Sequence, residues 1–190
     1  MANVDKPFGL RAARHASGGA IIGNEYPIAA SYTTAIYRGD LVEMAADGSI
    51  TASAAANADN LGVFEGVRYV DSTGRQQFNS YWPGLASCTE IFAIVQDDPN
   101  IIFQVQSDAT GFAAADVGQL FDIEYVAGNT KTGVSAVNAD VSATGATTNK
   151  TLRLLRIVND GINVAGAYSV GEVLIIEHVM RPNVAGTGGI

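Results

Sequence analysis

Two apolar runs separated by a polar break dominate the middle of the chain, in the segment Ile91–Gln106, IFAIVQDDPNIIFQVQ. Both runs are rich in Ile, Val and Phe, and β-branched and aromatic side chains favour strands. Pro99 fixes its own φ and directs the residue before it towards the extended region, which predicts a type I turn over Asp98–Ile101. We therefore expect a β-hairpin. Because its runs are apolar at nearly every position, the hairpin is expected to be central and covered on both faces.

Shorter segments on both sides of this hairpin also have strand patterns. Leu61–Val70 alternates, which predicts Val63, Glu65, Val67 and Tyr69 on one face and Phe64 and Arg68 on the other. The turn sequences Asp47-Gly48 and Asp71–Gly74 each predict a hairpin. Short strands at these intervals predict an all-β fold: a single β-barrel or a β-sandwich-like domain of short antiparallel hairpins. The other expected strands are Ala35–Met44, Ser49–Ser53, Arg75–Trp82, Gln119–Val126, Thr151–Val158 and Gly171–Met180.

A short pattern of a glycine, a polar residue and two apolar residues occurs at Gly39, Gly118 and Gly171. The three copies are irregularly spaced, so they do not indicate a repeat protein. Each copy predicts a glycine corner that leads into a strand.

The ends of the chain lack a strand pattern. Residues 1–25 contain Pro7, Gly9 and the pair Gly18-Gly19, and they are predicted to form an extended N-terminal arm. The β-rich body is expected to span residues 26–182, and residues 183–190 to form a flexible C-terminal tail. Residues 127–150 are rich in small and polar side chains, and their sequence fits either a long loop or a weak hairpin.

The composition fits one domain with a substantial core: 190 residues, 47% of them hydrophobic and 16% charged. The formal net charge is −8, and a non-specific nucleic-acid binder needs a basic surface, so direct nucleic-acid binding is not expected. The charge is uneven. Residues 1–14 carry three basic side chains and one acidic one, whereas residues 40–140 carry three basic and fourteen acidic ones. This distribution fits an acidic body with a slightly basic end, or a basic arm that docks on a separate acidic surface.

Cys88 is the one cysteine, so neither an intramolecular disulfide nor a cysteine-based zinc site is expected. No run approaches 18 apolar residues, and the N-terminus lacks the apolar segment of a signal peptide. We therefore expect neither a membrane partner nor secretion, and synthesis and assembly in a cytoplasm.

Several residues suggest chemistry but fit structural roles better. Asp97 and Asp98 could belong to a cation site, yet Asp is common in turns because it bonds the nearby backbone. His15 and His178 lie far apart in the sequence, and no nucleophile motif accompanies them. Arg38-Gly39-Asp40 matches a tripeptide that cell-adhesion receptors bind, but it directly precedes an apolar strand. We expect no catalytic residue, metal or cofactor, and hence no enzyme.

The order of several segments resembles tailed-bacteriophage head proteins of the decoration, or cement, class. The matching segments cover about three quarters of the chain, and residues 127–150 match least. They are MANVDKPFGL, AIYRGDLVEM, LGVFEGVRYVDSTGRQQFNSYWPG, QDDPNIIFQVQSD, TLRLLRIV and VGEVLIIEHVM.

The resemblance implies a β-rich virion protein on the capsid exterior, assembled in the host cytoplasm. Its implied partner is the major capsid protein of the same phage, and the class is often trimeric. The expected role is to reinforce the shell against internal DNA pressure.

The residues themselves suggest two binding hypotheses. In the first, the arm contacts the capsid, with Phe8 and Leu10 as apolar anchors and three cations, Lys6, Arg11 and Arg14, as charged contacts. In the second, the chain is a non-catalytic ligand- or glycan-binding β-module. Its stacking surface would be formed by Phe78, Tyr81 and Trp82, for which core packing is the competing interpretation.

Overall fold

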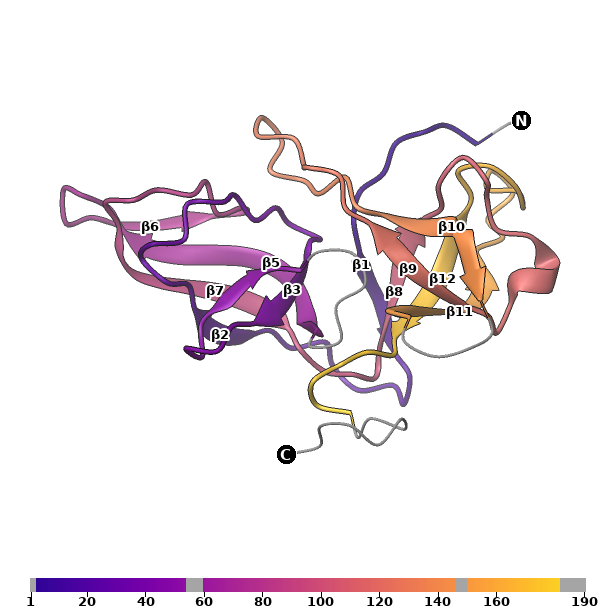
Figure 1. The fold of residues 1–190 in the computed structure, drawn as a ribbon, viewed down its shortest axis with the longest axis horizontal. Helices are drawn as coiled ribbons and strands as arrows, with labels where there is room; N and C mark the ends of the chain where they lie inside the picture. Colours follow the sequence, from indigo (N-terminus) through magenta and orange to yellow (C-terminus); the bar gives the residue numbers. More distant parts are fainter. Residues whose placement is uncertain (1–2, 54–59, 146–149, 182–190) are drawn as a thin grey trace.

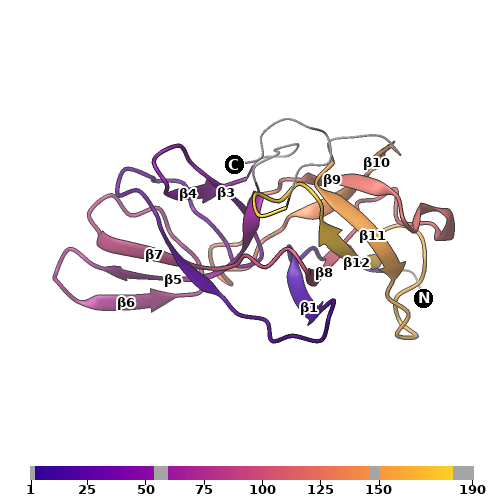
Figure 2. The same cartoon turned by 90° about the horizontal axis from the view of Figure 1, so that it is seen from below.

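The computed structural model describes residues 3–53, 60–145 and 150–181. It confirms the all-β fold class: two antiparallel sheets of six strands lie side by side along the long axis of the molecule (Figures 1 and 2). The fold is sandwich-like and is not a closed barrel. The strands are β1 (Arg11–His15), β2 (Asn24–Pro27), β3 (Leu41–Met44), β4 (Ile50–Ala52), β5 (Asn60–Val70), β6 (Gln76–Asn79), β7 (Thr89–Gln96), β8 (Ile101–Gln106), β9 (Leu120–Glu124), β10 (Asn138–Gly145), β11 (Leu152–Ile157) and β12 (Val170–Ile175), and a short 3-10 helix spans Ala114–Asp116.

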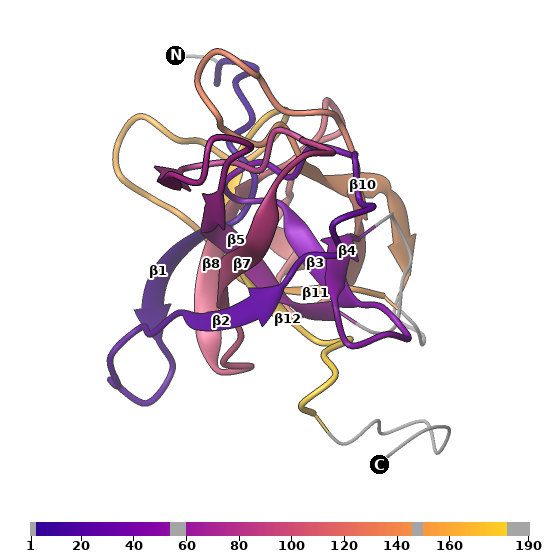
Figure 3. The same cartoon turned by 90° about the vertical axis from the view of Figure 1, so that its left-hand side faces the viewer.

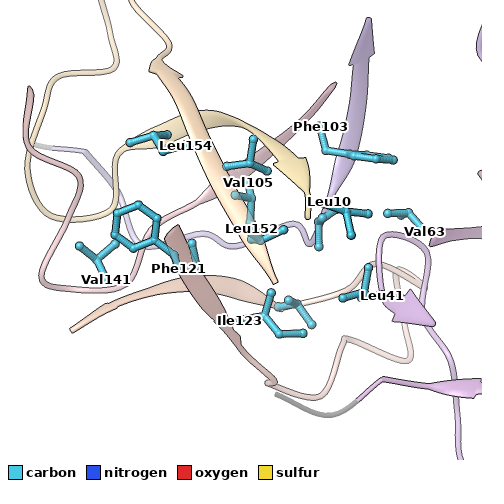
Figure 4. Packing of buried hydrophobic residues seen from close by; sticks show 14 of the residues in the cluster. Leu10, Leu41, Val63, Phe103, Val105, Phe121, Ile123, Val141, Leu152 and Leu154 are labelled. Carbon is cyan, nitrogen blue, oxygen red and sulfur yellow. The ribbon is translucent and has the colours of Figure 1, made fainter. Parts of the chain in front are cut away.

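The first sheet has the order β1-β8-β12-β11-β9-β10 and curls around its own apolar cluster. Figure 4 shows part of this cluster, including Phe103, Phe121 and Leu152. The curl brings β10 back towards the end of β8, where Ser107 and Ala139 form a parallel bridge. Burying this many apolar side chains is the main term that stabilises such a body.

The second sheet has the order β2-β7-β5-β3-β4, and β6 pairs with the far end of β5. Figure 3 views the molecule from this side, with β2, β5 and β7 in front. Its separate cluster is built around Trp82 and Phe64, which are both fully buried. The described residues therefore form two cores, and Leu41 and Val63 of the second sheet extend into the first.

The prediction of a hairpin over Ile91–Gln106 is wrong, because its two strands belong to different sheets. β7 pairs with β2 and β5, whereas β8 pairs with β1 and β12. The predicted turn is present, since the Ile101 N–H donates to the Asp98 carbonyl (3.1 Å). A turn fixes only the local path, and pairing depends on distant partners. The expected burial on both faces is confirmed for β8, which is buried at five of six positions, but is wrong for β7, where buried and half-buried side chains alternate.

The other predicted hairpins largely form. β3 pairs with β4 across Asp47-Gly48, and β5 pairs with β6 across Asp71–Gly74. Within residues 127–150, β10 pairs with β9, so this region contributes a strand and is more than a long loop.

The predicted faces of β5 are partly wrong. Val63 packs in the first core, whereas Val67 packs in the second, because the register shifts between Phe64 and Gly66. The extra residue, Glu65, changes which side chains share a face.

Two of the three predicted glycine corners precede a strand as expected. Gly39 and Gly118 have φ of 93° and 90° and lie two residues before the first residues of β3 and β9. Gly171 instead lies within β12, where it packs against Leu154 and Phe112. The sequence pattern was therefore not specific to the corner.

The predicted separate arm is corrected by the structure. Within residues 1–25, β1 joins the first sheet and β2 begins at Asn24 in the second. Leu10 is 2% exposed and packs in the first core (Figure 4). The hydrophobic pattern of residues 1–25 is irregular because this segment is short, crosses between the sheets and carries glycines at its bends. The predicted tail, residues 183–190, lies outside the described residues.

Candidate interaction groove

A groove of about 750 Å³ lies between the N-terminal segment and the loop that connects β9 to β10. In Figure 1 the base of this loop (orange) passes close to the N-terminal segment (indigo) at the top of the molecule, and the two segments also lie close together at the top of Figure 3. One wall consists of residues 6–8 and Arg11, and the other of residues 127–130, Thr132 and residues 134–136. Three of the five predicted contact residues, Lys6, Phe8 and Arg11, therefore line one groove.

A close glycine contact holds the N-terminal wall in place. Gly9 has φ of 72°, and a Cβ there would lie 2.5 Å from both the Gly39 carbonyl oxygen and the Ser135 Cβ. The adjacent Leu10 N–H donates to the Gly39 carbonyl (2.8 Å). Because Gly9 is conformationally permissive and lacks a side chain, the chain can turn at Gly9 from Phe8, which is half-buried in the groove wall, to Leu10 in the core.

The loop wall is attached to the same turn, Tyr37–Asp40. The Arg38 N–H donates to the Gly133 carbonyl (3.0 Å), and the Ser135 N–H donates to the Arg38 carbonyl (2.9 Å). The Gly39 N–H donates to the Phe64 carbonyl of β5 (2.8 Å). One turn therefore joins both groove walls to the second sheet.

Asp40 lies buried beneath this junction. Its Oδ2 accepts a hydrogen bond from the Tyr37 N–H (2.8 Å), and burial raises the pKa of its carboxyl group to about 6. Because Asp40 is fully buried and Arg38 forms an ion pair with Glu65, the tripeptide has a structural role, as expected.

Two cations line the groove and a third stands on its loop wall: Lys6, Arg11 and Lys131 are all exposed. Among the described residues none of them has a carboxylate within 4.0 Å. The Arg11 guanidinium stacks 5.0 Å from the Phe8 ring centroid, and its Nη2 donates to Gln104 Oε1 (2.7 Å). None of the described residues that line the groove is acidic, so a chain of net charge −8 presents a locally basic surface here.

The other two predicted contact residues do not line the groove. Leu10 is a core residue, so its expected role as a surface anchor is wrong. Arg14 is half-exposed, and its Nη2 lies 3.0 Å from an oxygen of Glu172, which also pairs with Arg156. Hydrogen bonds from Arg156, and then from Arg14, lower the pKa of Glu172 despite its burial.

Sequence reasoning missed the loop wall entirely. Asn129, Thr130 and Thr132 belong to a stretch of small polar residues without period, which gave no signal of a binding surface. The structure shows that the loop packs closely at Gly128, because a Cβ there would lie 2.4 Å from the Tyr37 ring.

The expected aromatic stacking surface does not exist. Trp82 is fully buried, packs edge-on against Tyr69 with ring centroids 5.5 Å apart, and donates its Nε1–H to the Tyr32 carbonyl. Tyr81 stacks on Tyr37, and Phe78 is 69% exposed on β6. The bulky aromatic run was therefore mainly core and edge packing.

The remaining candidate groups have structural partners. Asp97 accepts hydrogen bonds from Asn24 and from the Tyr26 hydroxyl, and Asp98 pairs with His15 Nε2 (2.9 Å). His178 Nδ1 accepts a hydrogen bond from the Met180 N–H (3.1 Å), and burial lowers the pKa of its imidazole to about 4. Asp97-Asp98 therefore helps to hold the crossover between the sheets together.

In the described ranges, no three side chains of His, Cys, Asp or Glu are grouped as a metal site would require. The same residues include no helix that is long and apolar enough to span a membrane.

Comparison with protein-family models, with curated proteins and with solved structures gave no match.

Proposed function

We propose that the chain is a structural virion protein that binds the outer surface of a phage capsid and stabilises the shell, as the decoration proteins that it resembles do. The observation that carries the proposal is the groove: Lys6, Phe8 and Arg11 combine positive charge with an aromatic surface on an otherwise acidic body. Charge-complementary surfaces of this kind determine which partner binds and how quickly.

The attachment of residues 3–15 to the body favours such a role. Ordering a free arm costs about 1–2 kcal/mol per residue in backbone entropy. Here β1 is already paired with β8, and the Lys6 N–H donates to Gln106 Oε1 (2.9 Å). The contact residues are therefore positioned before binding, and more of the interaction energy is available to hold the shell.

The partner is the major capsid protein of the same phage, and the protein acts without catalysis on the capsid exterior. Assembly as a homo-oligomer, with a trimer favoured, follows from the resemblance.

Co-sedimentation with purified capsids of the phage that encodes the chain tests this function. Deleting residues 1–14 would remove Leu10 and most of β1, so point variants are the better choice. We expect wild type to co-sediment with the shell, and the double variant Lys6→Glu/Arg11→Glu to bind at least about tenfold more weakly. Arg75→Glu is the charge-reversal control, because Arg75 is also exposed and has no carboxylate partner among the described residues. If wild type stays in the supernatant at every ratio tested, the proposed function is wrong.

A further inference from the structure

We propose that the groove binds an extended acidic peptide segment of the partner, with carboxylates on Lys6 and Arg11 and an apolar side chain on Phe8. This inference rests on the proposed function for the identity of the partner, the capsid protein. The chemistry of the groove itself comes from the described residues.

The form of the groove favours a chain segment over a flat surface. Its walls are two stretches of backbone, residues 6–8 and 127–136, and the groove is open, with a volume of about 750 Å³ that falls within the size range of ligand-binding sites. Pro7, Phe8 and Val134 supply apolar lining, while Asn129, Thr130 and Thr132 supply polar side chains. A peptide with alternating apolar and charged side chains matches such a lining.

The charges favour carboxylates. A guanidinium binds a carboxylate through two parallel N–H donors, and Arg11 is partly fixed by Phe8 and Gln104. Lys6 is close by in the same wall, and Lys131 stands between two lining residues of the other.

A nucleic acid fits this surface less well. A nucleic acid that extends beyond the groove needs a continuous basic surface, and residues 40–140 carry fourteen acidic groups against three basic ones. A short acidic peptide requires complementarity over the groove alone.

Two peptides test the inference on the full-length protein. The first is a fluorescein-labelled octapeptide of alternating Glu and Leu, and the second replaces each Glu with Gln. We expect the Glu peptide to bind in fluorescence anisotropy at least tenfold more tightly than the Gln peptide, and to weaken as salt is added. Lys6→Glu/Arg11→Glu should lower its affinity at least tenfold and Phe8→Ala about threefold, whereas Arg75→Glu should leave it unchanged.

A chemical-shift titration of the wild-type protein adds a readout that needs no variant. Shifts on adding the Glu peptide should concentrate in residues 3–11 and 127–136. The inference would be overturned if neither peptide bound, if both bound equally well, or if the shifts lay away from these segments. It would also be overturned if Arg75→Glu lost as much affinity for the Glu peptide as Lys6→Glu/Arg11→Glu, or if a single-stranded oligonucleotide bound more tightly than the Glu peptide.

The two proposals fail in different ways. If wild type binds capsids while the groove variants bind them equally well and the Glu peptide does not bind, the groove assignment is wrong and the function stands. If the Glu peptide binds in the groove but capsids are not bound, the proposed function is wrong and the acidic-peptide site stands.

Discussion

Arg11 and Arg14 lie three residues apart on β1, yet the structure uses them in opposite ways. Arg11 lines the groove, has no carboxylate partner among the described residues and is held by an aromatic ring and an amide. Arg14 pairs with Glu172, a side chain that is 3% exposed. One stretch of basic residues therefore divides into a groove end, which we propose binds the partner, and a stabilising end, and charge alone does not distinguish them.

Leu10, directly before Arg11, should give the largest effect. Leu10→Ala removes a fully packed side chain from the first core and is expected to lower the free energy of unfolding by about 3 kcal/mol. Urea denaturation measures this loss. A change below about 1 kcal/mol would mean that the N-terminal segment does not belong to the core and behaves as the free arm that the sequence suggested.

Glu172→Gln tests the stabilising end. Losing the charge on the carboxylate that Arg14 and Arg156 share is expected to cost about 2 kcal/mol at pH 7. Because the folded pKa of Glu172 is lowered, its contribution is fully present above the ordinary value of about 4.3 and is lost as the pH falls through the folded value. Thermal unfolding from pH 7 to pH 3 should therefore show a smaller acid-induced loss in the variant, and equal losses in both proteins would refute the ion pairs.

Asp40 gives the opposite pH dependence. Its folded pKa of about 6 lies above the ordinary value of about 3.9, so ionisation destabilises the folded state as the pH rises through this interval. Asp40→Asn should remove this penalty while keeping an oxygen that accepts the Tyr37 N–H. Relative to wild type, the variant should gain about 1 kcal/mol in unfolding free energy between pH 5 and pH 7.5. A constant difference across this range would contradict the buried, titrating carboxyl group.

The sequence predicted local features better than long-range ones. The turns at Asp47-Gly48 and Asp98–Ile101 depend on nearby residues, and both form. The pairing of β7 and β8 with strands of different sheets depends on partners tens of residues away, which periodicity cannot identify. Leu10 shows the same limit, because one apolar residue among glycines and cations has no pattern that marks it as core.

Only one wall of the groove could be predicted from the sequence, because the other wall depends on long-range contacts. Lys6, Phe8 and Arg11 stand out by residue type within a short segment, so sequence could nominate them. The opposite wall could not be nominated, because its position depends on backbone contacts with Arg38 and on the close approach of Gly9 and Gly39.

The most direct test measures capsid affinity and unfolding temperature together for Arg11→Gln and Arg14→Gln. Arg11→Gln should bind capsids about tenfold more weakly and unfold at the wild-type temperature, because it removes a charge-assisted contact from an exposed site. Arg14→Gln should bind as wild type and lose up to about 1 kcal/mol of stability, because Arg156 still pairs with Glu172. Loss of capsid binding in Arg14→Gln, with full binding retained in Arg11→Gln, would contradict the assignment of the groove as the capsid contact.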